Sequence, residues 1–193
     1  MSRIQRIGLY GGSFDPIHTG HVLVGQAAME ELALERLFFI PAARSPFKPE
    51  QQPAPCEHRL AMIRLALAGR SYCEVDDFEI QRGGTSFTID TVRYFTQRFP
   101  GAKLFYLIGA DNVAGLPKWR EAGELAELAE FVVIPRPGEA QPALPPPFQG
   151  SYLRGFPFGV SASQIRARIQ AGQPIEPLVP AAVAETIRNN RLY

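Results

Sequence analysis

The sequence predicts an α/β protein with a doubly wound, mostly parallel, Rossmann-like sheet that carries helices on both faces. Short apolar runs alternate along the chain with segments whose apolar residues recur at helical spacing, which is the pattern of strand–helix units in a parallel sheet. The first apolar run also ends in a glycine pair shortly before a helical segment. The 193 residues suit a single domain over 1–193 with a sizeable core, and we expect its C-terminal part to be helical from about residue 161.

The first half of the chain predicts three strands and two helices. We expect strand 6–12 because an apolar run ends in two glycines, strand 36–42 because its residues are almost all apolar, and strand 72–80 because apolar and polar residues alternate. Helix 18–34 is predicted by its alanine-rich middle. Helix 56–69 is predicted by apolar residues at helical spacing before a terminal glycine.

The second half continues the alternation. Helix 88–99 is followed by a Pro-Gly stop and then by the buried strand 103–111. Helix 123–130 and the buried strand 131–137 come next.

A proline-rich stretch over 137–150 separates the sheet from the C-terminal part. We interpret it as a surface loop, because too little chain follows for a second domain. Two helical patterns come after it, over 161–172 and 180–193.

Charge and cysteine content narrow the functional classes. The net charge is +1, so no broad basic field would attract nucleic acid, and phosphate binding must come from a local site. The two cysteines form no CxxC pair and are expected to be reduced thiols. No apolar run has the length of a signal peptide or a membrane span, so we expect a cytoplasmic protein that acts on small molecules. The sequence does not determine the oligomeric state, and a homo-oligomer is one alternative.

The stretch GGSFDPIHTGH over 11–21 carries the most specific chemistry. His18 and His21, two of only three histidines, follow Gly11 and Gly12 at a strand end. Three-residue spacing on a first helical turn puts both rings on one face, where their N–H groups can hold one polyphosphate. The glycines let the backbone approach a ligand without a Cβ in the way. Surface histidines without a role, or a zinc pair, are the alternatives, but zinc would need a third strong ligand and none is near in the sequence.

This stretch resembles the GxFDPxHxGH signature of the adenylyl- and cytidylyltransferase superfamily. VSASQIR over 160–166 is similar to the superfamily's second signature, ISSTxIR, although Ala162 replaces one of its usual serines. The resemblance implies that His18, His21 and Arg166 are catalytic. It implies an ATP site formed by Gly11, Gly12, Ser13, Phe14, His18, His21, Lys48, Ser161, Ser163 and Arg166.

Two further stretches resemble segments of the bacterial nicotinate-nucleotide adenylyltransferases: GGTSFTIDT over 83–91 and LIGADNVAGLPKW over 107–119. With them the resemblance covers nearly the whole chain. It implies that nicotinate mononucleotide reacts with ATP to give nicotinate adenine dinucleotide and pyrophosphate, in NAD biosynthesis. It also implies Mg²⁺ bound through the ATP phosphates, with no metal ligands from the protein. The implied mononucleotide-binding residues are Thr88, Asp111, Trp119 and Arg136.

These four residues suit such a substrate. Trp119 can stack on a pyridine ring, although a core position is the alternative. A helix that starts at Thr88 offers N–H groups to a carboxylate. Asp111 could meet a ribose or magnesium-bound water, or could cap a helix, and Arg136 could hold a phosphate. For Lys48 the alternative is a solvated surface residue.

Two other functions stay open. One is a different transferase of the same superfamily, such as one acting on phosphopantetheine. The other is a protein that binds a nucleotide without catalysis.

Overall fold

The computed structural model describes residues 5–46, 52–136, 138–156 and 158–193. In these ranges six strands form one sheet, in the order β3-β2-β1-β4-β5-β6, and every neighbouring pair is parallel. The strands are β1 (Arg6–Gly12), β2 (Arg36–Pro41), β3 (Cys73–Val75), β4 (Lys103–Gly109), β5 (Glu130–Ile134) and β6 (Gly150–Tyr152). The helices are α1 (Thr19–Glu31), α2 (Cys56–Leu67), α3 (Phe78–Arg82), α4 (Thr88–Arg98), the 3₁₀ helix η1 (Ala110–Lys118), α5 (Ala122–Leu128), α6 (Ala162–Gln170) and α7 (Ala181–Asn189).

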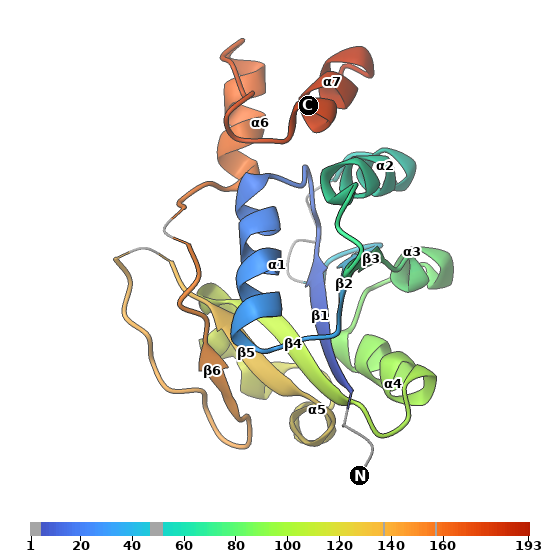
Figure 1. The fold of residues 1–193 in the computed structure, drawn as a ribbon, viewed down its shortest axis with the longest axis vertical. Coiled ribbons are helices and arrows are strands. Elements are labelled where there is room, and N and C mark those ends of the chain that lie inside the picture. Colours follow the sequence, from blue (N-terminus) through green and yellow to red (C-terminus); the bar gives the residue numbers. More distant parts are fainter. Residues whose placement is uncertain (1–4, 47–51, 137, 157) are drawn as a thin grey trace.

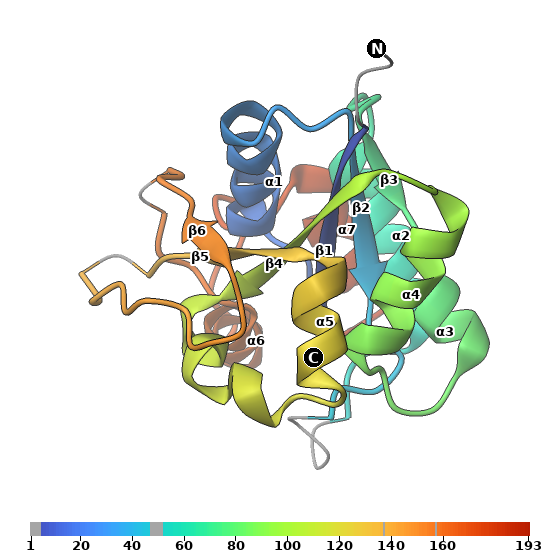
Figure 2. The same ribbon diagram turned by 90° about the horizontal axis from the view of Figure 1, so that it is seen from below.

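The sheet has an apolar core on each face, so the prediction of a doubly wound α/β fold is confirmed. Successive strand side chains point to opposite faces: Ile7 and Leu9 of β1 belong to one core and Tyr10 to the other. Residues of α1, α2, α6 and α7 pack in the core that contains Tyr10, and residues of α4, η1 and α5 pack in the other. Figure 2 shows α1 and α5 on opposite sides of the sheet.

The helices of the C-terminal part lie beyond the carboxyl end of β1 (Figure 1). There the backbone N–H of Thr19, at the start of α1, donates to the carbonyl of Leu178 at 2.9 Å. Ile165, Val183 and Ile187 are buried in the same core as α1. This part of the chain therefore packs directly against the segment that carries the histidines.

The predicted strand 72–80 is wrong in its second half, where the structure has α3. The chain turns at Asp76, whose Oδ1 accepts the backbone N–H of Phe78 at 3.0 Å, while its Oδ2 pairs with Arg98 at 2.5 Å. An Asp side chain that bonds the backbone two residues on favours a turn over a continued strand. The alternation of apolar residues hid this turn.

Besides α3, two elements were not predicted. The predicted strand 103–111 ends at Gly109 and continues into η1, and the proline-rich loop ends in the short edge strand β6. A Cβ at Gly150 would overlap the carbonyl of Phe131, so β6 can approach β5 only because this residue is glycine. The other predicted elements are confirmed, with ends that differ by a few residues. No helix in the described ranges is long and apolar enough to cross a bilayer.

Candidate active site

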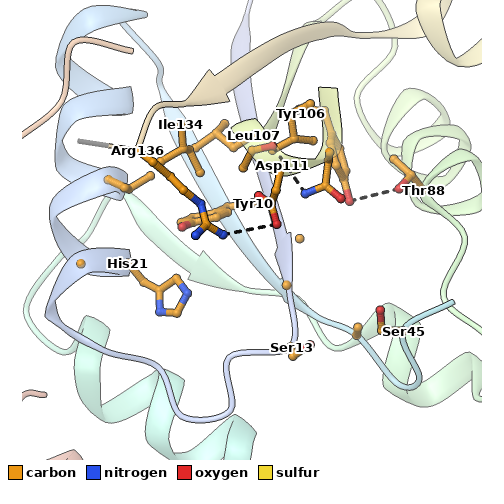
Figure 3. A pocket seen from close by; sticks show the side chains of 18 of the residues that line it. Tyr10, Ser13, His21, Ser45, Thr88, Tyr106, Leu107, Asp111, Ile134 and Arg136 are labelled. Carbon is orange, nitrogen blue, oxygen red and sulfur yellow. Dashed lines mark hydrogen bonds and ion pairs between the residues drawn. The ribbon is translucent and has the colours of Figure 1, made fainter. Parts of the chain in front are cut away.

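A pocket of about 960 Å³ opens at the carboxyl edge of the sheet, where ligands bind in folds of this class. The ends of β1, β4 and β5 line it together with the starts of α1 and α4 and with η1. Figure 3 shows the His21 ring on one side of this pocket and the Asp111 and Arg136 side chains on another. The residues predicted from the sequence that line it are Gly11, Gly12, Ser13, His18, His21, Thr88, Asp111, Trp119 and Arg136.

The two histidines are brought together as their spacing predicts. His18 is the N-cap of α1 and His21 lies on its first turn, and their rings stack with centroids 3.7 Å apart. Nδ1 of His21 accepts the backbone N–H of His18 at 3.2 Å, so the proton of the neutral His21 ring is on Nε2. His18 is only 6% exposed, and its Nδ1 has no hydrogen-bond partner among the described residues.

Burial keeps both rings uncharged in the free protein. Loss of hydration lowers the pKa of His18 from 6.5 to about 4. Burial also lowers the pKa of His21 well below 6.5, and the neighbouring His18 lowers it further. At neutral pH the pair therefore presents N–H donors rather than two positive charges. A polyphosphate placed against the rings would raise both pKa values, because an opposite charge favours the protonated form.

The glycines of this segment make room for rings of the protein itself. A Cβ at Gly11 would overlap the hydroxyl of Tyr106, and a Cβ at Gly20 would lie 3.0 Å from Nδ1 of His18. Gly11 lines the pocket as predicted. The structure adds a second reason for a glycine there, because Tyr106 closes over its face.

Phe14 does not line the pocket but lies beneath it. Its side chain is 2% exposed and its φ is +46°, a value that turns the chain sharply after β1. The ring packs edge-on to His21 with centroids 5.0 Å apart. A Cβ at Gly12 would lie 3.3 Å from the Phe14 ring. Phe14 thus supports His21 from the core side instead of touching the space that a ligand would occupy.

The start of α6 presents a different residue to the pocket than the sequence suggests. Ser161 caps the helix, its Oγ accepting the backbone N–H of Gln164 at 3.3 Å. Nη1 of Arg166 donates to the carbonyl of Asp15 at 2.7 Å, and Nη2 lies 3.4 Å from Oγ of Ser163. Gln164, at the variable position of the superfamily signature, lines the pocket, whereas Ser161, Ser163 and Arg166 do not.

The predicted mononucleotide-binding residues all line the other half of the pocket. Thr88 is the first residue of α4, as expected, and its Oγ1 lies 3.5 Å from the Tyr106 hydroxyl. Asp111 and Arg136 form an ion pair at 3.4 Å, with both side chains more than half exposed (Figure 3). Trp119 is half-buried, edge-on to the ring of Phe131 at 6.1 Å. One edge of the indole is thus held by the core while the residue still borders the pocket.

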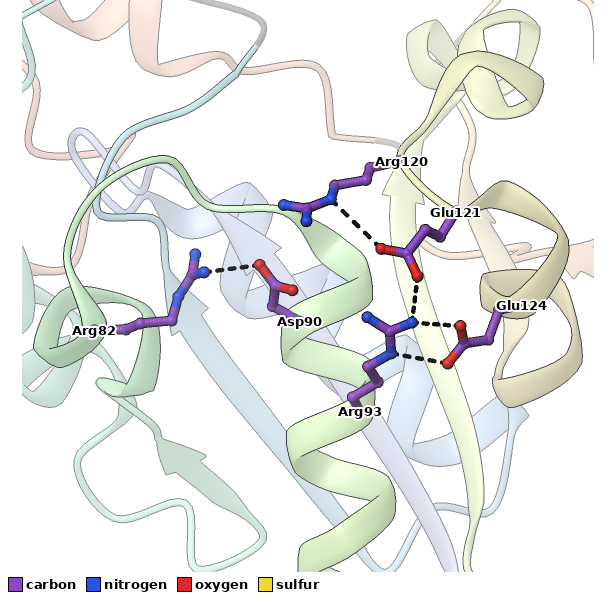
Figure 4. Close-up of polar contacts among 6 residues, drawn as sticks. All are labelled: Arg82, Asp90, Arg93, Arg120, Glu121 and Glu124. Carbon is purple, nitrogen blue, oxygen red and sulfur yellow. Dashed lines mark hydrogen bonds and ion pairs between the residues drawn. The ribbon is translucent and has the colours of Figure 1, made fainter.

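Ion pairs between α4 and α5 fix Trp119 relative to Thr88. Arg93 of α4 bonds the carboxylates of Glu121 and Glu124, and Figure 4 shows this guanidinium between the two acidic side chains. Arg120, next to Trp119, stacks on the ring of Phe87, which precedes Thr88, at 4.9 Å. Exposed ion pairs are individually worth ~0.2–1 kcal/mol, but pairs that share one arginine hold a loop better than a single pair does.

The cytidylyltransferase-like family model matches residues 9–168. A protein of Gemmatimonas aurantiaca, named a probable nicotinate-nucleotide adenylyltransferase, is 42% identical over 98% of this chain and 92% of its own. One of Opitutus terrae with the same name is 38% identical over 98% of both chains. The chain belongs to the nicotinate-nucleotide adenylyltransferase family. A Plasmodium falciparum nicotinic acid mononucleotide adenylyltransferase complexed with NaAD has the same fold, with a TM-score of 0.83, 19% identity and coverage of 98% and 97%.

Glu79 and Tyr106 are among the pocket residues that sequence reasoning missed in this member of the nicotinate-nucleotide adenylyltransferase family. Glu79 is 4% exposed, lines the pocket and accepts the Thr91 hydroxyl at 2.5 Å, and burial raises the pKa of its carboxyl group. Tyr106 also lines the pocket, and burial raises the pKa of its hydroxyl. Glu79 falls in the strand that was wrongly predicted, and Tyr106 falls in an apolar run typical of a core, so neither had a signal of its own. Lys48 lies outside the described residues.

Proposed function

We propose that this chain is a nicotinate-nucleotide adenylyltransferase, which joins nicotinate mononucleotide and ATP to give nicotinate adenine dinucleotide and pyrophosphate. The family membership supports this reaction, and so does one structural observation. A single continuous pocket carries the histidine pair at one side and Thr88 and Trp119 at another. A triphosphate and a pyridine nucleotide could therefore lie in it together. In this proposal residues 1–193 act as one catalytic domain in the cytoplasm.

The reaction needs no nucleophile from the protein. An oxygen of the mononucleotide's 5′-phosphate attacks the α-phosphorus of ATP in line, and the bond from that phosphorus to the pyrophosphate oxygen breaks. The protein contributes position and stabilisation of charge. We assign the ring N–H groups of His18 and His21 to the triphosphate, where they meet the negative charge that grows on the departing pyrophosphate. Ser13 and the glycines beside it border the same space.

The wall around Trp119 would hold the mononucleotide. Its indole can cover one face of the pyridine ring, and N–H groups at the start of α4 can receive the ring's carboxylate. Arg136 is exposed and bears the charge that a phosphate requires, so we assign it to the mononucleotide's phosphate. In the free protein Asp111 holds this guanidinium, and a phosphate would replace that carboxylate.

Magnesium fits this site as an ion held by phosphate oxygens and water. No group of three or more His, Cys, Asp or Glu side chains in the described ranges is arranged to hold a metal. Mg²⁺ commonly keeps several waters and binds through substrate phosphates. Asp111 is an exposed carboxylate in the pocket and could accept hydrogen bonds from that water. When bound, the ion would offset negative charge on the phosphates.

The C-terminal signature has an indirect part in this proposal. Arg166 fixes the carbonyl of Asp15, in the segment that leads to His18, and Ser161 and Ser163 support the start of α6. Gln164 is the residue of this helix that would meet the ligand.

A pyrophosphate-release assay tests the proposal. We expect turnover with ATP and nicotinate mononucleotide, and none with ATP and phosphopantetheine. The rate with nicotinamide mononucleotide, compared with that of the nicotinate compound, measures the preference for the acid. His21→Ala should lower kcat by ~10²–10³, because a preorganised donor to developing charge is lost. His58→Ala, on α2 outside the pocket lining, is the matched control. Turnover with phosphopantetheine alone would assign a different transferase, and no release with any substrate would favour a binding protein.

A further inference from the structure

The segment between β1 and α1 is held by contacts from distant parts of the chain. It runs from Ser13 to His18, and His18 and His21 take their positions from where it ends. The carbonyl of Ser13 accepts Nη1 of Arg59 at 2.8 Å, and Arg59 is fully buried. A buried guanidinium is unusual, so this contact marks the segment as one whose geometry is tightly fixed.

Asp15 is the centre of these contacts. Its side chain is 3% exposed, and its Oδ1 accepts the backbone N–H of Ala54 at 2.9 Å. Its carbonyl accepts Arg166, whose guanidinium also lies 3.8 Å from Oδ2. A buried carboxylate needs such partners, because an unpaired charge in the interior costs far more than a paired one.

Tyr193 supplies the remaining partner of this carboxylate. Its hydroxyl donates to Oδ1 of Asp15 at 2.7 Å, the distance of a strong hydrogen bond to a charged acceptor. Burial, and then the contact with Asp15, raise the pKa of Tyr193, so the hydroxyl keeps its proton and stays a donor. The two residues are 178 positions apart in the sequence, and Tyr193 does not line the pocket.

We propose that Tyr193 is a positioning residue for the histidine pair, acting through Asp15 on the segment that ends at His18. It touches no substrate. Without its hydroxyl, Oδ1 of Asp15 keeps only the backbone bond from Ala54, and the segment gains freedom where small displacements matter most. This inference rests on the proposed function, because the effect of Tyr193 on kcat arises from how His18 and His21 are placed against the triphosphate.

Tyr193→Phe removes the hydroxyl and leaves the ring. We expect kcat for pyrophosphate release to fall roughly tenfold, since a slight misplacement of catalytic groups can cost up to ~10² in rate. KM for nicotinate mononucleotide should change by less than about twofold, because Thr88 and Trp119 lie on other elements. Tyr152→Phe is the matched control: its hydroxyl donates to the carbonyl of Pro142 at 2.8 Å on the exposed edge strand, away from the pocket.

The ring-nitrogen NMR signals of the histidines give a readout that does not depend on turnover. The signals of His18 and His21 should move in Tyr193→Phe and stay in place in Tyr152→Phe. Asp15→Asn should lower kcat as well, and combining it with Tyr193→Phe should add little, because both act through one contact. This second variant also serves if Tyr193→Phe fails to fold.

Two results would overturn the positioning role. One is wild-type kcat with unmoved histidine signals. The other is a lowered melting temperature with unchanged kcat well below that temperature, which would make the contact purely structural. If the wild-type protein releases no pyrophosphate, the proposed function fails, and the histidine signals alone decide whether Tyr193 positions the pair.

Discussion

The buried ring of His18 should make the stability of the protein fall as the pH is lowered. The pKa of this ring drops from 6.5 to about 4 on folding, so the unfolded chain binds a proton more readily than the folded one. The contribution of His18 to stability is therefore fully present above about pH 6.5 and is lost as the pH falls towards 4. Between about pH 7.5 and about pH 5 the loss is ~2 kcal/mol from this group alone, because each pKa unit is worth ~1.4 kcal/mol.

Thermal melts at these two pH values measure the effect. A loss of ~2 kcal/mol lowers the melting temperature of a chain of this size by about 4–8 °C. His18→Asn, which removes the titrating ring, should show a pH-dependent drop that is smaller by this amount. His58→Asn keeps both pocket rings, so its melting temperature should fall on acidification by as much as that of the wild type. If His18→Asn and the wild type lose the same number of degrees on acidification, His18 does not carry the shifted pKa and the argument from its burial fails.

Two further predictions concern the walls of the pocket. Gly11→Ala should cost ~1–3 kcal/mol of stability, because its Cβ would overlap the Tyr106 hydroxyl. Adding Tyr106→Phe in the same chain should restore most of this stability. A Gly11→Ala variant with the melting temperature of the wild type would contradict the prediction. Trp119→Ala should weaken binding of nicotinate mononucleotide by about 5- to 150-fold and leave ATP binding nearly unchanged, since stacking on an aromatic side chain is worth ~1–3 kcal/mol. Trp119 is the only tryptophan, so a fluorescence titration of the wild type measures the same contact. Emission that does not change on addition of nicotinate mononucleotide would indicate that Trp119 is a core residue and does not stack on the ligand.

The fold was predictable because its main signals are local. An apolar run ended by glycines specifies β1, an alanine-rich helical segment specifies α1, and a helical segment with a Pro-Gly stop specifies α4, all without knowledge of their neighbours. The edge strand β6 has no such signal: its three residues, Gly-Ser-Tyr, form a strand only because β5 offers a free edge. The prediction failed at Asp76 for the opposite reason. The sequence there does alternate apolar and polar residues, and this pattern concealed the turn that the Asp76 side chain makes by bonding to the backbone.

The candidate site was predictable where one motif holds several of its residues, as with His18 and His21. It was not predictable where the deciding contact joins distant segments. The sequence shows a glycine at position 11 but not the Tyr106 hydroxyl that covers it, and it shows an arginine at 166 but not the Asp15 carbonyl that takes its guanidinium. Such pairs are fixed by packing of the finished sheet.

The hydrogen bond between His21 Nδ1 and the backbone of His18 bears on how any substitution at position 21 is interpreted. One imidazole serves two purposes at once: one nitrogen closes the end of α1, and the other is left for the ligand. An alanine there removes both, so the lower kcat expected of His21→Ala includes any fraying of α1 in addition to the loss of the donor. Asparagine separates them, because its amide oxygen can still accept the backbone N–H while no ring remains to reach the pocket. The difference between the asparagine variant and the wild type isolates the loss of the donor, and the difference between the two variants measures the contribution of the helix end.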